Sequence, residues 1–504
     1  MAISLFSPAR IGPLKLRNRS IRSAAFEGMC PNGVPSESLI NYHRAVAAGG
    51  IGMTTVAYVS VQNNGRTFSH QAWMRPEIVP HLKKLTDAVH REGAAASIQL
   101  GHGGHMGDRK VTGERAMSPS GKFNLYGLTL PHAMSESDIQ ECARAHGRAV
   151  SLAKQAGFDA VEIHAGHGYL ISQFLSPSTN TRRDQYGGGL ENRARFLRLV
   201  IREVKKAAGD SMAILVKTNI EDGFKGGMDI TEGIQVARII EQEGADAIVL
   251  SGGFVSKTPF FMMKGVTPHR ELISYQKNPF IKLGMICFSR LIIHDYPYRE
   301  VYFLDQAVKF RSALKIPLVY VGGIVSHAGI QKALDAGFEF VALARALIAE
   351  PDFVNRIKNN PTHISPCLTC GPSNSCVAVM YMGEMSAFSN KVKDHDEAFT
   401  ALRGILNRLN RCSNALRRVF EVVKIIALFP FIPRAAIACL KQRKNGAKRD
   451  NGICEKKGEI VNGTTVNAEP KEMVQQAREV AIRQPGGKIS QEARIELKNP
   501  RRRR

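Results

Sequence analysis

The chain has 504 residues, of which 44% are hydrophobic and 45 are glycines. This composition excludes a wholly disordered, collagenous or coiled-coil protein, and the length allows one large domain with an extension. The formal net charge is +25, and residues 401–504 supply +15 of it through 24 basic and 9 acidic side chains. The excess of positive charge is therefore concentrated in the last fifth of the chain.

The amino-terminal residues and the cysteines indicate a reducing compartment. The first ten residues, MAISLFSPAR, reach a proline after a very short apolar stretch and therefore lack the hydrophobic region of a signal peptide. Nine cysteines in such a chain are expected to be thiols and not a disulfide framework. Residues 419–440 are apolar, but charged residues and prolines interrupt them, so they do not predict a membrane span. We therefore expect a cytoplasmic protein.

Eight short runs rich in Val, Ile and Ala, each followed by a helical pattern, are typical of a buried parallel sheet. The runs cover residues 20–25, 51–59, 94–100, 160–165, 213–219, 247–251, 318–323 and 340–344. The main helical patterns cover residues 80–92, 138–156, 191–208, 231–243 and 302–314. Eight such units predict an α/β fold, a (β/α)8 TIM barrel within residues 1–376, with extra length after the third and sixth strands. An open doubly wound sheet is the alternative, although no GxGxxG motif opens a helix.

Polar side chains gather where the predicted strands end, which is the edge of a barrel that carries chemistry. His164 and His167 follow the fourth strand and are three residues apart, so both imidazoles can face one carbonyl oxygen and stabilise negative charge on it. Tyr169 lies two residues further on and could act as a general acid. Loop histidines bonded to backbone and a packing tyrosine are the plainer interpretation. No third ligand stands at metal-binding spacing, so we expect no metal.

A second group of residues lies at the ends of the last two strands. Gly322 and Gly323 end the seventh strand and Arg345 follows the eighth, where many barrels bind phosphate through backbone N–H groups and one cation. A glycine pair can also be no more than a turn.

The stretch 164–193, HAGHGYLISQFLSPSTNTRRDQYGGGLENR, closely resembles the segment after the fourth strand in the old yellow enzyme family of FMN-dependent ene-reductases. The branch it resembles is shared with the barrel domain of dienoyl-CoA reductases. Further agreement comes from LRNR at 16–19, QLGHGG at 99–104, the pair Gly322 and Gly323, and ARALIAEPD at 344–352. The resemblance covers roughly residues 3–370.

The resemblance implies an FMN-binding barrel that takes electrons from NADH or NADPH and reduces the C=C bond of α,β-unsaturated carbonyl compounds. It implies that His164 and His167 grip the carbonyl oxygen, while Tyr169 is the proton donor. The FMN phosphate would lie on Gly322, Gly323 and Arg345. The remaining cofactor-binding residues would be Gln99, Lys217, Ala24 and Ala57, with Lys217 beside the edge of the flavin that becomes negative on reduction. The run Ala24-Ala25-Phe26-Glu27 departs from the family pattern.

Dienoyl-CoA reductases carry four cysteines past the barrel that ligate an iron–sulfur cluster. This chain has Cys367, Cys370 and Cys376 and then no cysteine until Cys412. Three ligands of altered spacing do not suit a cluster, and we expect ordinary thiols. A degenerate site or a zinc ion with a water is the alternative.

The predicted barrel is followed by a basic extension. Residues 377–440 could form amphipathic basic helices, and residues 441–504 have the polar composition of a disordered tail. The helical part suits either packing on a protein surface, including a second copy in a homo-oligomer, or peripheral contact with an anionic membrane. The final RRRR indicates no specific nucleic acid.

Two other functions remain open at this stage. One is a flavin-binding interaction or membrane-associated protein with residual NADH:flavin oxidoreductase activity. The other is a sugar-phosphate aldolase or isomerase barrel, for which Lys217 is the only candidate Schiff-base lysine. Retention of His164, His167 and Tyr169 together favours the ene-reductase, because a binding module needs no proton donor.

Overall fold

The computed structural model describes residues 3–124, 129–275, 279–368, 374 and 376. The chain divides into a unit of residues 1–407 and a unit of residues 408–504. The second unit, like the predicted basic helices (377–440) and tail (441–504), lies outside the described residues. Everything below concerns the first unit.

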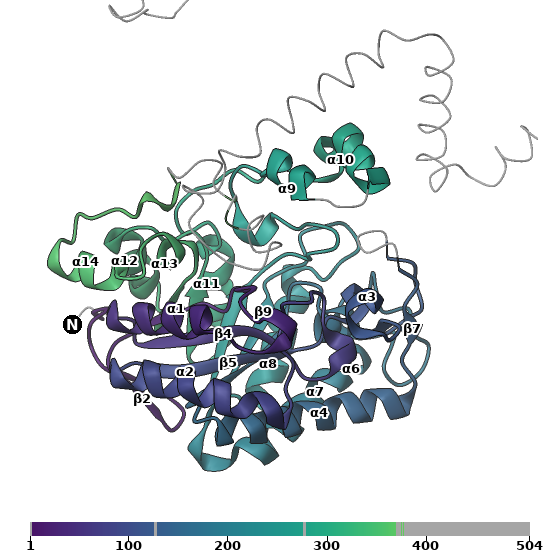
Figure 1. Ribbon diagram of the computed structural model, residues 1–504, viewed down its shortest axis with the longest axis horizontal. Coiled ribbons are helices and arrows are strands. Elements are labelled where there is room, and N and C mark those ends of the chain that lie inside the picture. The colour runs from purple at the N-terminus through teal and green to yellow at the C-terminus, as the bar shows by residue number, and fades with distance from the viewer. Residues whose placement is uncertain (1–2, 125–128, 276–278, 369–373, 375, 377–504) are drawn as a thin grey trace, which may run out of the picture. The chain divides into compact units, whose positions relative to one another are not determined.

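Eight parallel strands close into a barrel (Figure 1). Their order around the barrel is β10-β11-β12-β3-β4-β5-β8-β9, and β12 closes on β3 through the pair Val341 and Ser20. The strands are β3 (Ser20–Arg22), β4 (Met53–Ser60), β5 (Ala95–Gly101), β8 (Ala160–Ala165), β9 (Ala213–Asn219), β10 (Ala247–Ser251), β11 (Leu318–Val321) and β12 (Phe340–Leu343). The predicted TIM barrel is confirmed, and closure rules out the open doubly wound sheet.

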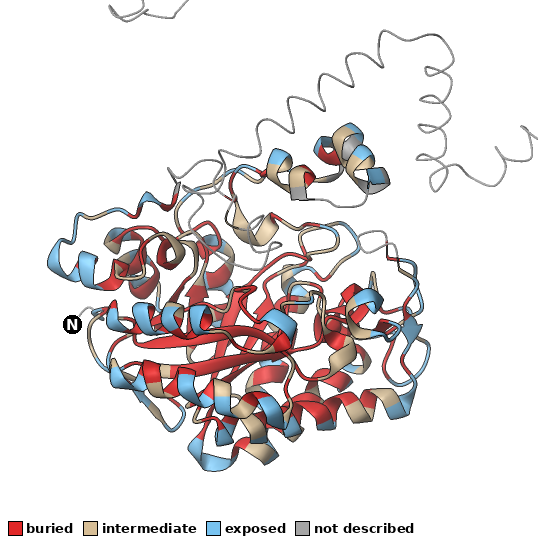
Figure 2. Ribbon diagram, in the orientation of Figure 1, coloured by how far each residue is buried: buried red, intermediate tan, exposed pale blue. Residues whose placement is uncertain are grey.

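Helices surround the barrel strands, with their outward faces exposed and their inward faces buried (Figure 2). They are α1 (Glu37–Ala48), α2 (Val79–Arg91), α4 (Glu136–Gln155), α6 (Leu190–Arg193), α7 (Arg195–Ala208), α8 (Ile230–Gln242), α11 (Leu304–Ala313) and α12 (His327–Asp335). The start of α4 shows why a helix forms there: Ser135 accepts from the backbone N–H of Asp138, whose carboxylate accepts from the backbone N–H of Ser135. The predicted helix 191–208 is divided at Ala194 into α6 and α7.

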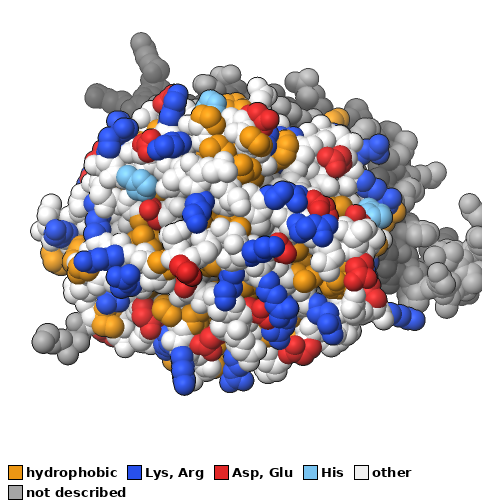
Figure 3. Space-filling view, turned by 90° about the horizontal axis from the view of Figure 1, so that it is seen from below, with side chains coloured by type: hydrophobic (Ala, Val, Ile, Leu, Met, Phe, Trp, Pro, Cys, Tyr) orange, Lys and Arg blue, Asp and Glu red, His pale blue; other side chains and the backbone are white. Residues whose placement is uncertain are grey.

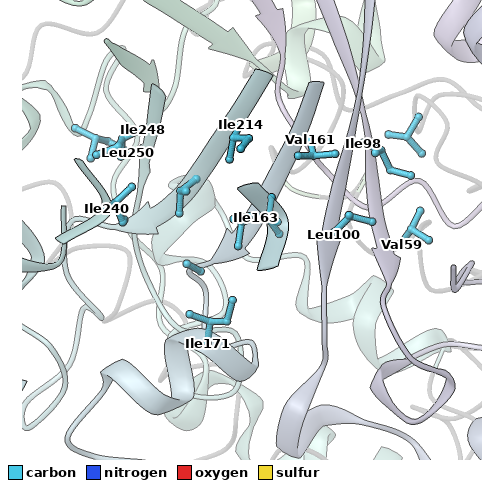
Figure 4. Close-up of a cluster of buried hydrophobic side chains, with 14 of the residues drawn as sticks. Val59, Ile98, Leu100, Val161, Ile163, Ile171, Ile214, Ile240, Ile248 and Leu250 are labelled. Atoms are coloured by element: carbon cyan, nitrogen blue, oxygen red, sulfur yellow. The ribbon is translucent and has the colours of Figure 1, made fainter. Parts of the chain in front are cut away.

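The larger apolar core lies between the strands and the helices, because alternate strand side chains point outward from the barrel. Figure 4 shows part of it, contributed by β5, β8, β9, α5 (Leu170–Leu175) and α8: Ile98, Leu100, Val161, Ile163, Ile214, Ile171 and Ile240. A smaller apolar cluster contains the opposite strand side chains together with Ile11 and Leu16 of the hairpin β1 (Ala9–Ile11) and β2 (Leu14–Leu16). The hairpin therefore covers one end of the barrel interior.

Gly12, in the turn of that hairpin, shows which end is covered. Its φ is +51°, and a Cβ there would lie 2.5 Å from the carboxyl carbon of Asp246, the residue before β10. The hairpin thus closes the amino-terminal end of the strands, and the carboxyl-terminal end remains for the site.

Two long segments follow the third and sixth barrel strands, as predicted. Between β5 and β8 lie α3 (Arg109–Thr112), β6 (Met117–Ser118) and β7 (His132–Ala133). Between β10 and β11 lie α9 (His269–Tyr275) and α10 (Pro279–Ile292) before the chain reaches α11. After β12 the chain forms α13 (Arg345–Ala349) and α14 (Phe353–Asn359).

On the face drawn in Figure 3, basic and acidic side chains are interspersed. On α7, Arg198 and Arg202 both lie 2.8 Å from the carboxylate of Glu243. No helix within the described ranges is long and apolar enough to cross a membrane.

Candidate active site

Three aromatic rings meet at the carboxyl end of β8. His164 is the fifth residue of that strand, and His167 and Tyr169 follow in the turn that leads into α5. The ring centroids of His164 and His167 are 5.1 Å apart and the rings are nearly perpendicular, while those of His164 and Tyr169 are 4.4 Å apart. The structure thus brings the three predicted catalytic side chains into one cluster.

The position of His167 depends on contacts from β9 and β10. Its φ of +59° is unusual for a residue with a side chain, so the surroundings must impose this conformation. Its backbone N–H donates to Oδ1 of Asn219 at 2.9 Å, and its Nε2 lies 2.7 Å from Oγ of Ser251. Asn219 is fixed in turn, because its amide donates to Asp222 and to the carbonyl of Gly253, both at 2.9 Å. The imidazole is therefore anchored at both its backbone and its ring.

Both imidazoles of the cluster are neutral at ordinary pH. Burial lowers the pKa of His167 to about 3, with a smaller effect from the positive charge of Lys217. Burial also puts the pKa of His164 well below 6.5, and His167 and Lys217 lower it further. The backbone N–H of Gly166 donates to Nδ1 of His164 at 3.4 Å, which leaves the proton on Nε2. His164 can therefore donate a hydrogen bond to a ligand oxygen.

A second tyrosine, Tyr58 of β4, completes the aromatic cluster. Its ring centroid lies 4.7 Å from that of Tyr169 and 5.9 Å from that of His164. Burial raises the pKa of Tyr58 to about 12, although hydrogen bonds with Thr67, Gln71 and Tyr169 act in the opposite direction. The Tyr58 phenol therefore stays protonated.

Gln99 and Lys217 meet on one buried carboxylate inside the mouth of the barrel. The amide of Gln99 on β5 donates to Oε1 of Glu162 at 2.6 Å, and Nζ of Lys217 on β9 lies 2.9 Å from the same oxygen. Lys217 also donates to Oγ of Ser23 at 3.3 Å and to the carbonyl of Ala24 at 3.4 Å. Ala24 thus lies beside Lys217.

Ala57 lies on β4, next to Tyr58, and its backbone N–H is occupied within the protein. Both carboxylate oxygens of Glu27 accept from it at 3.1 Å. Arg22 donates to Glu27 at 2.6 Å, and Nε2 of His43 lies 3.4 Å from the same carboxylate. Glu27, which departs from the family pattern, therefore forms a buried ion pair with Arg22 in the loop after β3.

The predicted phosphate residues directly follow two paired strands, β11 and β12. Gly322 and Gly323 have φ of +148° and +75°, and a Cβ on Gly323 would lie 2.6 Å from the ring of Tyr302, so only glycine suits this turn. Arg345 donates to Oδ1 of Asn374 at 2.8 Å and to the carbonyl of Lys264 at 3.2 Å. The ammonium of Lys264 lies 5.4 Å from the centre of the Tyr302 ring. Two cations therefore lie close to the glycine turn.

These donors suit FMN. An isoalloxazine ring presents acceptors along its pyrimidine edge, and the amide of Gln99 and the ammonium of Lys217 are buried donors on β5 and β9, the two strands that flank β8. The phosphate requires cations and close approach to backbone, which Arg345, Lys264 and the turn at Gly322 and Gly323 provide. The donor set thus matches both ends of the cofactor.

Cys367 and Cys376 fall within the described residues, and Cys370 and Cys412 do not. Where the chain is described, no group of three or more His, Cys, Asp or Glu side chains could hold a metal ion.

The sequence matches the NADH:flavin oxidoreductase / NADH oxidase family over residues 4–286. A 4,4'-dithiodibutanoate disulfide reductase of Rhodococcus erythropolis is 39% identical over 381 residues, which cover 75% of this chain and 94% of that protein. A cinnamate reductase of Clostridium sporogenes is 30% identical over 394 residues, which cover 73% of this chain and 54% of that protein. The chain therefore spans about half the length of the latter relative. The solved structure of the old yellow enzyme homologue from Zymomonas mobilis has a TM-score of 0.57 and 24% identity, covers 72% of this chain and 94% of its own, and shows the same fold.

The barrel, its buried donors and these matches define a flavin-dependent (β/α)8 oxidoreductase. The chain belongs to the NADH:flavin oxidoreductase / NADH oxidase family, the family of the old yellow enzymes, and uses FMN with NADH or NADPH as reductant. The resemblance found in the sequence is confirmed.

Sequence reasoning missed four polar residues that contact the predicted site residues: Tyr58, Glu162, Asn219 and Ser251. Each belongs to one of the predicted strands, but its side chain was not identified as part of the site. The one available signal was position, because Ser251 and Asn219 are the last residues of their strands.

Proposed function

We propose that the protein is an FMN-dependent reductase of the C=C bond of α,β-unsaturated carbonyl compounds, driven by NADH or NADPH. The observation that carries this proposal is the cluster of two neutral imidazoles and a phenol formed by His164, His167 and Tyr169. A site of this kind can bind one carbonyl oxygen and deliver one proton. That combination suits reduction of a conjugated double bond.

In this proposal the barrel mouth holds the cofactor through groups on or just after six strands. Gln99 and Lys217 bind the pyrimidine edge of the flavin, with Ala24 and Ala57 beside it. The turn at Gly322 and Gly323 and the guanidinium of Arg345 bind the phosphate. Bound FMN supplies a hydride to the β-carbon of the acceptor.

The imidazoles stabilise charge on the acceptor oxygen. Hydride addition at the β-carbon moves negative charge onto the oxygen, and hydrogen bonds from His164 and His167 become stronger as this charge grows. Because burial keeps both rings neutral, they donate hydrogen bonds without being able to protonate the oxygen readily. The contact between His167 and Ser251 holds the second ring in position for this role.

Tyr169 then delivers the proton. Its phenol adjoins His164 and stands at the start of α5, on the same side of the barrel mouth as the carbonyl-binding pair. Proton transfer from the phenol oxygen to the α-carbon completes the saturated product.

A disulfide acceptor is the second candidate, favoured by the 39% identity to the R. erythropolis disulfide reductase. Hydride addition to one sulfur breaks the S–S bond and yields a thiol and a thiolate, and Tyr169 would protonate the thiolate. The two candidates use the same proton donor, but only the carbonyl compound needs the imidazole pair at an oxygen.

In the deciding experiment, the flavoprotein is reduced anaerobically with NADH or NADPH. It is then mixed in a stopped-flow instrument with cinnamaldehyde or with 4,4'-dithiodibutanoate, and the rate of flavin reoxidation is followed. Fast flavin reoxidation by the aldehyde with formation of the saturated aldehyde supports the first proposal. Fast reoxidation by the disulfide alone supports the second. Reoxidation by neither would favour the flavin-binding protein with residual activity. The cytoplasmic location, a homo-oligomer and contact of the basic extension with anionic membranes stay predictions.

A further inference from the structure

Tyr58 is a buried phenol in the catalytic cluster to which the proposed reaction assigns no role. Tyr58 is 3% exposed. It lies between Val56 and Val59, where the pairing register of β4 with β5 shifts. Such irregularities at the rim of a barrel turn a side chain in a new direction. Here the shift accompanies the contact between the rings of Tyr58 and Tyr169 at 4.7 Å.

The hydrogen bonds around Tyr58 determine where its proton points. Nε2 of Gln71 donates to the Tyr58 carbonyl at 3.2 Å, so the amide oxygen of Gln71 is the acceptor that faces Thr67. That oxygen accepts from the Thr67 backbone N–H at 2.8 Å and from the Thr67 hydroxyl at 3.1 Å. The only hydroxyl proton of Thr67 is therefore committed to Gln71.

Either oxygen could donate in the 3.3 Å contact between Tyr58 and Thr67. With the Thr67 proton on Gln71, Tyr58 is the donor in this contact. The Tyr58 oxygen keeps its lone pairs for the hydrogen bond with Tyr169. This assignment makes the chain of donors run from Tyr169 to Tyr58 to Thr67 to Gln71, which is the arrangement that the proposal below uses.

We propose that Tyr58 is a positioning residue for the proton donor: it orients the Tyr169 hydroxyl before proton transfer and donates to the Tyr169 oxygen afterwards. This inference rests on the proposed function. In the transfer step the O–H bond of Tyr169 breaks, its proton forms the C–H bond with the electron pair of the α-carbon, and the Tyr169 oxygen keeps the negative charge. The Tyr58 hydroxyl keeps its own proton and turns from Thr67 to that oxygen.

The turn is favourable because a hydrogen bond to a charged oxygen is stronger than one to a neutral hydroxyl. Burial leaves few water molecules to replace Tyr58 in this role, and the high pKa of Tyr58 keeps its proton in place over the working range. In the proposal Tyr58 therefore stabilises the charged Tyr169 oxygen, and Thr67 competes for the same donor.

This competition gives the two neighbours opposite effects. Tyr58→Phe keeps the ring contacts and removes the donor, so the pKa of Tyr169 should rise by about one to two units. Thr67→Val keeps the shape and removes the competing acceptor, so the pKa of Tyr169 should fall. Thr67→Ser keeps the hydroxyl and should leave it unchanged. A merely structural disturbance would not produce opposite signs.

The pKa can be measured without turnover. The flavoprotein is labelled with 3-fluorotyrosine, the Tyr169 resonance is assigned by its loss in Tyr169→Phe, and its ¹⁹F shift is titrated in each variant. Tyr186→Phe is the matched control, because Tyr186 is also 3% exposed as a residue and its phenol oxygen pairs with Gln140 at 3.2 Å, away from Tyr169. Equal Tyr169 titrations in the wild type, Tyr58→Phe and Thr67→Val, or shifts of the same sign, would overturn the inference.

Turnover supplies the second measurement. Flavin reduction by NADH or NADPH should be unchanged in Tyr58→Phe, while reoxidation by cinnamaldehyde should slow roughly tenfold, with its alkaline limb at higher pH. Equal slowing of both half-reactions would also contradict the inference. If the wild type does not react with cinnamaldehyde, the proposed function fails, and the fluorine titration still decides the role of Tyr58.

Discussion

Nζ of Lys217 lies 2.9 Å from Oε1 of Glu162, and both side chains are almost fully buried at the mouth of the barrel. Taking two charges out of water is costly, and an ion pair of this kind is retained only where its geometry is good and other hydrogen bonds complete it. Gln99, Ser23 and Ala24 supply those bonds. The pair therefore holds a positive charge at the place where the proposed flavin edge becomes negative.

The first prediction concerns this pair. Glu162→Leu leaves the Lys217 ammonium buried without its partner and should lower the free energy of unfolding by about 3–5 kcal/mol. The double change Glu162→Leu with Lys217→Met removes both charges and should cost clearly less than the sum of the single changes. Urea unfolding of the single and double variants measures this coupling, and additive losses would show that the two charges do not interact.

The second prediction concerns cofactor retention. The protein should purify yellow with one FMN per chain, and Arg345→Ala should lose most of it, because a charge-assisted hydrogen bond contributes about 1.5–3 kcal/mol. Lys15→Ala removes one exposed charge from the hairpin at the opposite end of the barrel and should keep the flavin. Flavin absorbance per chain measures the bound cofactor. A wild-type protein that is colourless and stays colourless after FMN is added would contradict the assignment of these residues to FMN binding.

A third prediction separates the imidazoles from the phenol. Tyr169→Phe should leave flavin reduction by NADH or NADPH nearly intact and slow reoxidation by an enal roughly 10²–10⁴-fold, because the phenol supplies only the proton. The double change His164→Ala with His167→Ala should slow both half-reactions and weaken binding of phenolic ligands, since the nicotinamide amide and the acceptor oxygen would use the same donors. Stopped-flow measurement of each half-reaction distinguishes them. Equal slowing by Tyr169→Phe would make Tyr169 a packing residue.

The fourth prediction is a loss of stability in mild acid. Burial lowers the pKa of His102 to about 3 and those of His105 and His146 to about 4, whereas an unfolded histidine titrates near 6.5. The unfolded chain thus binds more protons, so stability rises with pH between about 4 and 6.5 and is lost as pH falls through that range. Each such histidine contributes up to about 1.4 kcal/mol per pH unit.

His146 offers the cleanest test of that slope, because it is fully buried in α4 with Nδ1 2.8 Å from the carbonyl of Cys142. In urea unfolding measured from pH 4.5 to 7, His146→Gln should flatten the pH dependence relative to the wild type. His90→Gln is the control: its pKa is raised, chiefly by the hydrogen bond with Asp159, so it should not flatten the acid slope. Identical slopes in all three proteins would contradict the assignment to buried neutral histidines.

The fifth prediction concerns the cysteines after the barrel. The sequence has Cys367, Cys370 and Cys376 but no fourth cysteine at the spacing of cluster-binding relatives. Anaerobically prepared protein should therefore contain no iron–sulfur cluster. Iron and acid-labile sulfide are assayed per chain. About four of each would prove this prediction wrong.

The barrel could be predicted because its strands are continuous apolar runs, a pattern that a buried parallel sheet imposes on each strand separately. All eight runs became barrel strands, and the long segments lie after β5 and β10 as expected. The rule that chemistry lies at the carboxyl ends of barrel strands also needs only local information. It was enough to choose His164, His167 and Tyr169, and the ring centroids of His167 and Tyr169 lie 5.1 Å and 4.4 Å from that of His164.

Contacts between different strands could not be predicted in this way. Glu162 looks like one polar residue inside an apolar run until the closed barrel sets it between Gln99 and Lys217. Tyr58 looks like a packing residue until the irregular pairing of β4 with β5 turns it toward Tyr169. The sequence by itself determined the strands, the barrel and the family, since periodicity and motifs are properties of short segments. Only the tertiary structure decided which buried charges and phenols meet, because those distances depend on how the barrel closes.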